Sequence, residues 1–255
     1  MRNIGIYLRF DGTNYAGWQR QKKVMTVQQA VEEAIEEVTG AFSFVEGCGR
    51  TDAGVHALCY VASFKTESNI PVSRMHLALN TKLPPDIRAL SAFEADENFH
   101  ARFSAEKKTY RYEIDNEKVE NPFWRNLTWH FPYALDVNKM NRAAKAFLGT
   151  HDFFGFMASG GQVKTTVRTI YGAEVFEENG KIVFEVTGNG FLYNMVRIMA
   201  GTLCYIGAGK ITEPLELIIE SRDRARAGIT APPQGLYMKK VYFGGDKAWE
   251  KADCM

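Results

Sequence analysis

The chain has 255 residues, of which 45% are hydrophobic and 24% are charged. This length allows between one and two domains at about 150 residues each. The composition is that of a folded globular protein, which excludes a disordered or collagen-like chain. No apolar run approaches the ~20 residues of a membrane helix, and the N-terminal residues show no secretory signal. We therefore expect a cytoplasmic protein with no membrane partner.

The net charge is only +1, so the strongly basic composition of many nucleic-acid-binding domains is absent. Positive charge is nevertheless concentrated in two segments, residues 20–23 and 100–111. The basic residues there are Arg20, Lys22, Lys23, Arg102, Lys107, Lys108 and Arg111. Acidic residues gather instead at 32–37. Charge alone leaves two interpretations open, solvated faces or local patches for a polyanion.

The first half of the chain predicts strands alternating with helices. Apolar residues alternate over 4–10, which predicts a strand. Apolar residues at helical spacing predict a helix that begins after Thr26 and ends at Gly40. A short strand near Val45 leads into a glycine-rich loop. The other predicted elements are a strand at 58–64, a helix at 73–79 and a strand at 87–93.

The second half repeats this plan. A strand at 109–114 precedes a helix capped by Asp136 and ended by Gly149. The Asn179-Gly180 pair predicts a hairpin turn between two strands. Those strands span 167–176 and 182–187, followed by helices at 192–206 and 213–220 and a strand at 236–243. The segment His151-Asp152-Phe153 is interpreted as capping and packing at a helix end.

These elements favour an α+β fold with antiparallel sheets covered by helices on one face. We expect two related subdomains, residues 1–103 and 104–243, followed by a tail at 244–255. A cleft between the two halves is the expected ligand site.

A glycine-rich loop carries the first candidate chemistry. Residues 49–57 read GRTDAGVHA, and their glycines let the backbone turn tightly. Such a loop can present Arg50 and Asp52. An aspartate can serve as a nucleophile, a base or a metal ligand, and His56 is the only second metal ligand nearby. The alternative is that Asp52 is simply a turn residue.

The predicted helix at 192–206 carries a charged residue in apolar surroundings. Its side chains are apolar nearly all round, which predicts burial, yet Arg197 lies in its middle. A buried guanidinium is costly unless an anion pairs with it, and no acid lies within four residues. Asp52 is a candidate partner that would be held ionised. The alternative is that Arg197 extends to the surface.

Aromatic residues accompany the basic segments. Tyr110 lies in a basic predicted strand, where its ring can stack on a nucleobase while lysines contact phosphates. Trp18 beside Arg20 offers the same mixture in a loop. The alternative for Tyr110 is packing on a sheet face. Walker A and dinucleotide-binding motifs are missing, so nucleotide cofactors have little support. No Cys/His cluster has zinc spacing.

Several motifs together resemble the tRNA pseudouridine synthase A family. They are FDGTNYAGWQ at 10–19, GRTDAGVHA at 49–57, FHARFSAEKKTYRY at 99–112, HDFFGF at 151–156, TVRTI at 166–170, GNGFLYNMVRIMAGTL at 188–203 and APPQGLYMKKVYF at 231–243. The resemblance spans residues 4–243 in the family's order and is therefore specific. The tail beyond Phe243 carries no motif.

The resemblance implies two ferredoxin-like halves with joined antiparallel sheets, and a homodimer. It implies isomerisation of uridine to pseudouridine at positions 38, 39 and 40 of the tRNA anticodon stem-loop, with no cofactor and no metal. By motif, Asp52 is the catalytic nucleophile, Arg197 orients it, and Tyr110 stacks on the target base and can accept a proton. It leaves open whether Asp52 attacks ribose C1′, attacks the base or assists a glycal route.

The expected substrate contacts come from both the resemblance and the charge pattern. They are Tyr110, Arg50, His56, Lys107, Lys108 and Arg20. A non-catalytic RNA-binding module is the first alternative function, because it needs the same basic patches but not Asp52. A metal-assisted hydrolase using Asp52 and His56 is the second.

Overall fold

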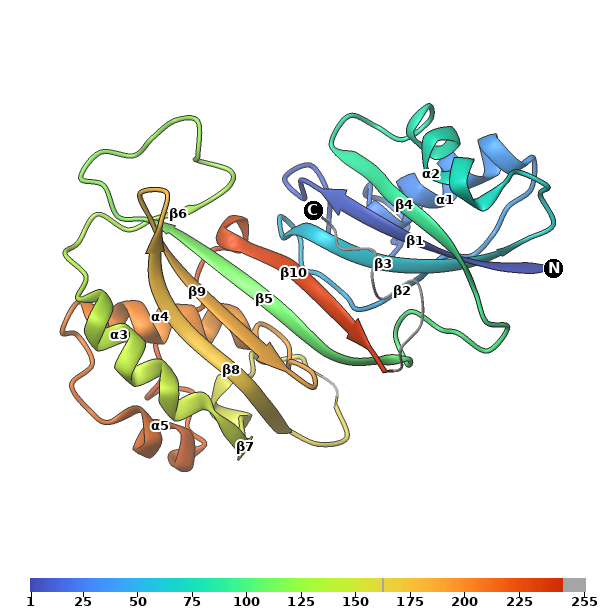
Figure 1. The fold of residues 1–255 in the computed structure, drawn as a ribbon. Helices are drawn as coiled ribbons and strands as arrows, with labels where there is room; N and C mark the ends of the chain where they lie inside the picture. Colours follow the sequence, from blue (N-terminus) through green and yellow to red (C-terminus); the bar gives the residue numbers. More distant parts are fainter. Residues whose placement is uncertain (162, 245–255) are drawn as a thin grey trace. The chain divides into compact units, whose positions relative to one another are not determined.

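The structure is a computed structural model that describes residues 1–161 and 163–244. It divides into two compact units (Figure 1). Unit 1 comprises Met1–Glu106 and the described residues from Met238 onward, and unit 2 comprises Lys107–Tyr237. The sequence places residues 104–243 together, whereas here most of the C-terminal strand groups with unit 1. The predicted tail from residue 245 lies outside the described residues.

Unit 1 has two helices, each of which follows a strand and precedes another. Its elements are β1 (Arg2–Phe10), α1 (Val27–Thr39), β2 (Glu46–Gly47), β3 (His56–Thr66), α2 (Val72–Asn80) and β4 (Ile87–Ala95). The strands run β4-β1-β3, with β2 also paired to β3, and all these pairs are antiparallel. β10 (Leu236–Phe243) follows β3 in the strand order. Helices α1 and α2 contact each other and cover one face of this sheet (Figure 1).

Unit 2 repeats the strand, helix, hairpin and helix arrangement. Its main elements are β5 (Ala105–Asp115), β6 (Trp129–His130), α3 (Val137–Ala144), β7 (Gly149–Asp152), β8 (Val167–Glu178), β9 (Lys181–Gly188), α4 (Met195–Gly207) and α5 (Leu215–Ser221). Short 3-10 turns span Lys145–Phe147, Phe154–Phe156 and Pro233–Gly235. The order is β5-β9-β8-β7, all antiparallel, while β6 is parallel to β5. The α+β class is therefore confirmed.

Local signals fix most of the element boundaries. Thr26 caps α1 by accepting a hydrogen bond from Gln29 N at 3.3 Å, and Gly40 ends it with φ +78°. The Asn179-Gly180 turn joins β8 and β9 with φ of 52° and 75°. Both central residues have positive φ, as a two-residue hairpin turn requires.

One prediction fails around Gly149. The helix ends at Ala144 and not at Gly149, and a 3-10 turn follows it. Gly149 begins β7, which pairs with β8, so His151 and Asp152 lie on a strand and not at a helix end. The φ of +98° at Gly149 turns the chain into this strand, and glycine makes that conformation inexpensive.

Apolar side chains on the sheet and helix faces form the core of each unit. In unit 1, Ile4, Ile6 and Ile35 are fully buried. In unit 2, the rings of Phe147 and Phe156 meet edge to face at 5.4 Å. Burial of such a side chain contributes about 1.5–3 kcal/mol. Within the described residues, no helix is long and apolar enough to cross a membrane.

We expect Thr26→Ala to lower the free energy of unfolding by about 1 kcal/mol, because α1 loses the acceptor for one of its first N–H groups. Glu36→Ala, on the exposed face of the same helix, is the control and should change stability little. Urea denaturation of both variants measures the difference. Equal stabilities would contradict this role of Thr26.

Candidate active site

The glycine-rich loop between β2 and β3 is fixed in place by the loop after β1. Trp18 N donates to Thr51 O at 3.1 Å, and Gly54 N donates to Tyr15 O at 3.3 Å. Gly17 has φ +85°, and a Cβ there would lie 2.3 Å from Thr51 O. Only glycine allows this approach of the two backbones. The position of the Asp52 backbone therefore depends on the sequence of a separate loop.

Asp52 lies half-buried at the turn of this loop. The turn is closed by the backbone, since Val55 N donates to Asp52 O at 3.2 Å and Gly54 has φ +76°. The backbone therefore closes the turn, and the role of the carboxylate stays a prediction.

Tyr15 anchors the supporting loop from its other end. Its hydroxyl donates to Asp86 Oδ1 at 2.5 Å, and its side chain is buried. Burial raises the pKa of the Tyr15 phenol well above its usual range, and the hydrogen bond to Asp86 raises it further. The phenol therefore stays protonated and keeps donating. Sequence analysis did not single out this residue.

His56 lies at the start of β3 and is 1% exposed. Its Nδ1 accepts from Gly12 N at 3.0 Å and lies 3.1 Å from Asp11 Oδ1. The bond from Gly12 ties the ring to the turn after β1. A contact between His56 and substrate, which the sequence predicts, remains a prediction.

Trp18 packs inside unit 1 instead of presenting its ring. It is 3% exposed and stacks on Tyr60, with centroids 4.2 Å apart. The Tyr60 hydroxyl donates to Gly49 O at 2.5 Å. This pair therefore supports the start of the glycine-rich loop, and Trp18 is not the nucleobase platform that its basic neighbours suggested.

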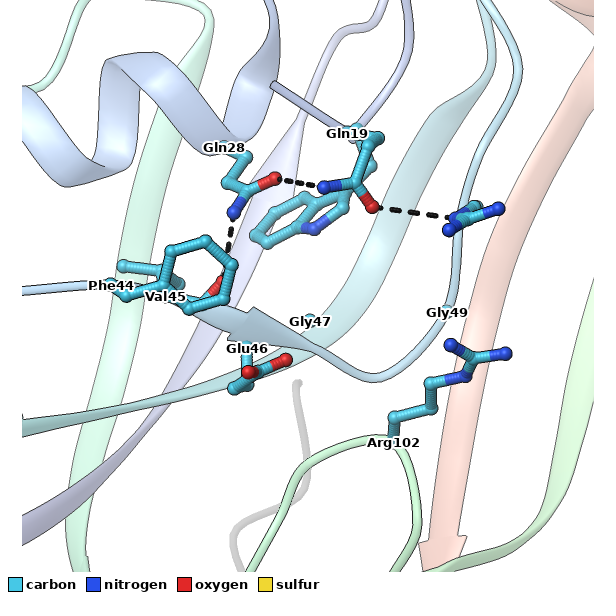
Figure 2. Close-up of a pocket in the computed structure, with 10 residues that line it drawn as sticks. Gln19, Gln28, Phe44, Val45, Glu46, Gly47, Gly49 and Arg102 are labelled. Atoms are coloured by element: carbon cyan, nitrogen blue, oxygen red, sulfur yellow. Dashed lines mark hydrogen bonds between the residues drawn. The ribbon is translucent and has the colours of Figure 1, made fainter. Parts of the chain in front are cut away.

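A chain of polar side chains connects α1 to Arg50 (Figure 2). Arg50 Nε donates to Gln19 Oε1 at 3.3 Å, and Gln19 Nε2 donates to Gln28 Oε1 at 3.1 Å. Gln28 is 1% exposed, and its Nε2 donates to Glu32 Oε1 at 3.0 Å and to Val45 O at 3.1 Å. Arg50 itself is exposed, so this network connects a surface guanidinium to buried polar groups.

Glu32 corrects an expectation from the charge pattern. The acidic segment 32–37 suggested a solvated helix face, yet the Glu32 side chain is 0% exposed. Arg20 Nη1 donates to its Oε2 at 2.6 Å, and Val45 N donates to its Oε1 at 3.2 Å. These bonds compensate for its burial. Arg20, expected to contact substrate, thus has one terminal nitrogen in an ion pair while 44% of its side chain stays exposed.

Helical spacing in the sequence indicates the two buried members of this network. Gln28 and Glu32 are four residues apart, next to Val27 and Val31 of the apolar stripe. Polar residues at such positions face the interior and need partners. The sequence could not identify those partners, because they come from other segments.

Tyr110 lies on β5 in unit 2. Its ring is 8% exposed and meets Phe191 edge to face at 5.1 Å. Across the sheet it pairs with Val186 of β9. Phe191 thus fixes the orientation of the Tyr110 ring.

The two lysines before Tyr110 lie on opposite faces of β5. Lys108 is two residues from Tyr110 and shares its face, whereas Lys107 shares the face of Arg111. Arg111 pairs there with Glu113, Glu178 and Glu185, and Lys181 pairs with Glu113. This cluster around Arg111 has three carboxylates and two cations, so it is unfavourable for binding a polyanion.

Arg197 lies in the first turn of α4, after Asn194 with φ +59°. Its Nε donates to Ala231 O at 2.7 Å and its Nη1 to Asn194 Oδ1 at 2.8 Å. These two neutral acceptors help to orient the guanidinium. The side chain is half-buried.

The predicted site residues therefore fall into two groups. Unit 1 holds Arg20, Arg50, Asp52 and His56, and unit 2 holds Lys107, Lys108, Tyr110 and Arg197. The pairing of Asp52 with Arg197 joins different units and stays a prediction. In the described part of the chain, no three His, Cys, Asp or Glu side chains are grouped to hold a metal ion.

Comparison with known proteins gives a consistent result. The family model described as "tRNA pseudouridine synthase" matches residues 6–104 and 143–244. The chain is 48% identical over 244 residues to tRNA pseudouridine synthase A of Thermoanaerobacter sp. (strain X514), covering 95% of this chain and 100% of that protein. It is 49% identical over 244 residues to the Acetivibrio thermocellus protein of the same name, with the same coverage.

Among solved structures, one match is the archaeal box H/ACA sRNP Nop10-Cbf5 complex, at 11% identity and a TM-score of 0.36. It covers 80% of this chain and 42% of that one, and this likeness is too low to carry an argument. The family model and the relatives settle the assignment, and the motif resemblance is confirmed: the chain belongs to the tRNA pseudouridine synthase A family.

Proposed function

We propose that this chain converts uridine to pseudouridine in the anticodon stem-loop of tRNA with Asp52 as the nucleophile. Membership of the family supports the reaction, and the loop around Asp52 supports the role of that residue. The modified positions are 38, 39 and 40, as the family resemblance implies. The active protein is a homodimer on the same ground.

The reaction exchanges one bond to ribose for another. The N1–C1′ bond breaks and a C5–C1′ bond forms, while C5 loses its proton and N1 gains one from solvent. The base must leave the stack before C1′ is accessible, which costs a few kcal/mol. Contacts between basic side chains and phosphates can supply that energy without sequence readout.

The local geometry supports the three roles. Asp52 extends from a loop whose backbone is fixed by Thr51 and Gly54, so its carboxylate starts from a defined position. Arg197, oriented by two neutral acceptors, orients the carboxylate of Asp52. Tyr110, held edge to face by Phe191, stacks on the target base and helps to remove the C5 proton, which passes to solvent.

The decisive experiment is tritium release from tRNA labelled at C5 of uridine, with no metal or nucleotide added. We expect release by the wild type and none by Asp52→Asn, because the amide is a poor nucleophile. Asp52→Asn should still bind tRNA. If neither protein releases tritium while both bind tRNA, the chain is a non-catalytic RNA-binding module.

The predicted ion pair has a test that does not use activity. We expect Asp52→Asn and Arg197→Gln to show a coupling of about 0.5–3 kcal/mol in the free energy of unfolding, because paired charged groups are not additive. Combining Asp52→Asn with Arg224→Gln is the control, since Arg224 bonds to Gly228 O and Thr230. Additive effects in both cycles would contradict the pairing.

The two faces of β5 give a further prediction. Lys108→Ala should weaken tRNA binding and lower the slope of log Kd against log salt by about 0.7–0.9. Lys107→Ala should have a smaller effect, because Lys107 shares its face with the acidic cluster around Arg111. Titration of both variants at several salt concentrations measures this. Equal losses would show that the face of Tyr110 is not where the RNA lies.

A further inference from the structure

A pocket beside the catalytic loop has no role in the reaction described above. Its walls come from the loop after β1, from α1, from β2 with the loops before and after it, and from the segment before β5 (Figure 2). The lining residues are Trp18, Gln19, Gln28, Phe44, Val45, Glu46, Gly47, Gly49, Arg50 and Arg102. All of them belong to unit 1. Because Arg50 is two residues from Asp52, the pocket adjoins the loop that carries the nucleophile.

The pocket has an exposed aromatic ring on one side. Phe44 is 53% exposed, although the backbone around it is anchored. Ser43 Oγ donates to Lys65 O at 2.8 Å, while Val45 N and Val45 O bond to Glu32 and Gln28. A half-exposed ring on an anchored backbone offers a flat apolar face. Bases stack on such faces with little sequence preference.

The guanidinium groups of Arg50 and Arg102 line the opposite side of the pocket. In Figure 2, Phe44 and Arg102 stand on either side of Glu46 and Gly47. Gln19 holds Nε of Arg50, and among the described residues no acceptor is recorded for its Nη nitrogens. Arg102 is exposed, with its guanidinium 5.5 Å from the centre of the Phe103 ring. Arginine matches phosphate geometry through paired N–H groups.

One carboxylate lines the pocket and has to be weighed against these cations. Glu46 Oε2 lies 3.4 Å from Nε2 of His100, a residue that does not line the pocket. Two arginines against one glutamate leave the lining net positive. Gln28 is fully engaged by its neighbours and serves as a wall. The lining therefore favours an anion attached to a flat ring.

We propose that this pocket binds a nucleotide of the tRNA strand next to the target uridine, with its base on Phe44 and its phosphate on Arg50 and Arg102. The inference rests on the proposed function, because it assumes that RNA approaches Asp52. It assigns a substrate contact to Phe44, which lies in none of the motifs, and one to Arg102, which the charge pattern placed only in a basic segment. A protein partner is disfavoured, because the pocket is small and shares Arg50 with the catalytic loop.

The test compares two variants with two matched controls. Phe44→Ser is compared with Phe42→Ser, which changes a ring that is 56% exposed but does not line the pocket. Arg102→Gln is compared with Arg74→Gln, an exposed arginine on α2. The readouts are the Kd for unmodified tRNA transcript at several salt concentrations, and KM and kcat from tritium release.

We expect Phe44→Ser to raise Kd by about fivefold or more, since a base stack is lost, with an unchanged salt slope. Arg102→Gln should raise Kd and lower the salt slope by about 0.7–0.9, since one phosphate contact is lost. Both should raise KM more than they lower kcat. The two controls should bind tRNA like the wild type.

The proposal is overturned if either pocket variant binds tRNA like its control. Tritium release by the wild type in that case leaves the proposed function standing and removes only the pocket. Absence of release by the wild type would refute the proposed function instead. The Kd comparison would then still decide whether the pocket contacts RNA.

Discussion

The close approach of two loop backbones in unit 1 determines where the candidate nucleophile lies. The loop after β1 meets the loop before β3 through the bonds of Trp18 and Tyr15 to Thr51 and Gly54. A side chain at Gly17 would collide with this contact, as a Cβ there would lie 2.3 Å from Thr51 O. The family motifs at 10–19 and 49–57 therefore pack against each other. The first holds the backbone from which the second presents Asp52.

Buried polar groups link this fixed backbone to an exposed arginine. Glu32 and Gln28 are both almost fully buried and bond to Val45 and to each other. From Gln28, the network passes through Gln19 to exposed Arg50. Leaving such groups unpaired in the interior would cost about 1–3 kcal/mol each. The same bonds that satisfy them also anchor the backbone before β2 and the guanidinium of Arg50 next to the glycine-rich loop.

In unit 2, the alternation of side chains along a strand separates charges that are adjacent in sequence. Lys107 and Lys108 read as one basic patch, but the pleat sends them to different faces. One face carries Tyr110, and the other carries Arg111 within an acidic cluster. Arg111 is engaged in ion pairs. Burial alone would lower its pKa, but the paired carboxylates raise it. Only part of the apparent positive charge therefore remains for RNA.

The sequence by itself determined the element order, the α+β class, the helix cap at Thr26, the hairpin at Asn179-Gly180 and the family. These follow from local propensities, periodicity and short motifs, which need no knowledge of distant partners. The tertiary structure alone decided the burial of Glu32, the packing of Trp18 on Tyr60, the anchoring of His56 and the strand at Gly149. Each of these depends on which segments, remote in the chain, meet in space. A buried polar group is stable only beside its partners, and single-chain patterns show the group but not the partners.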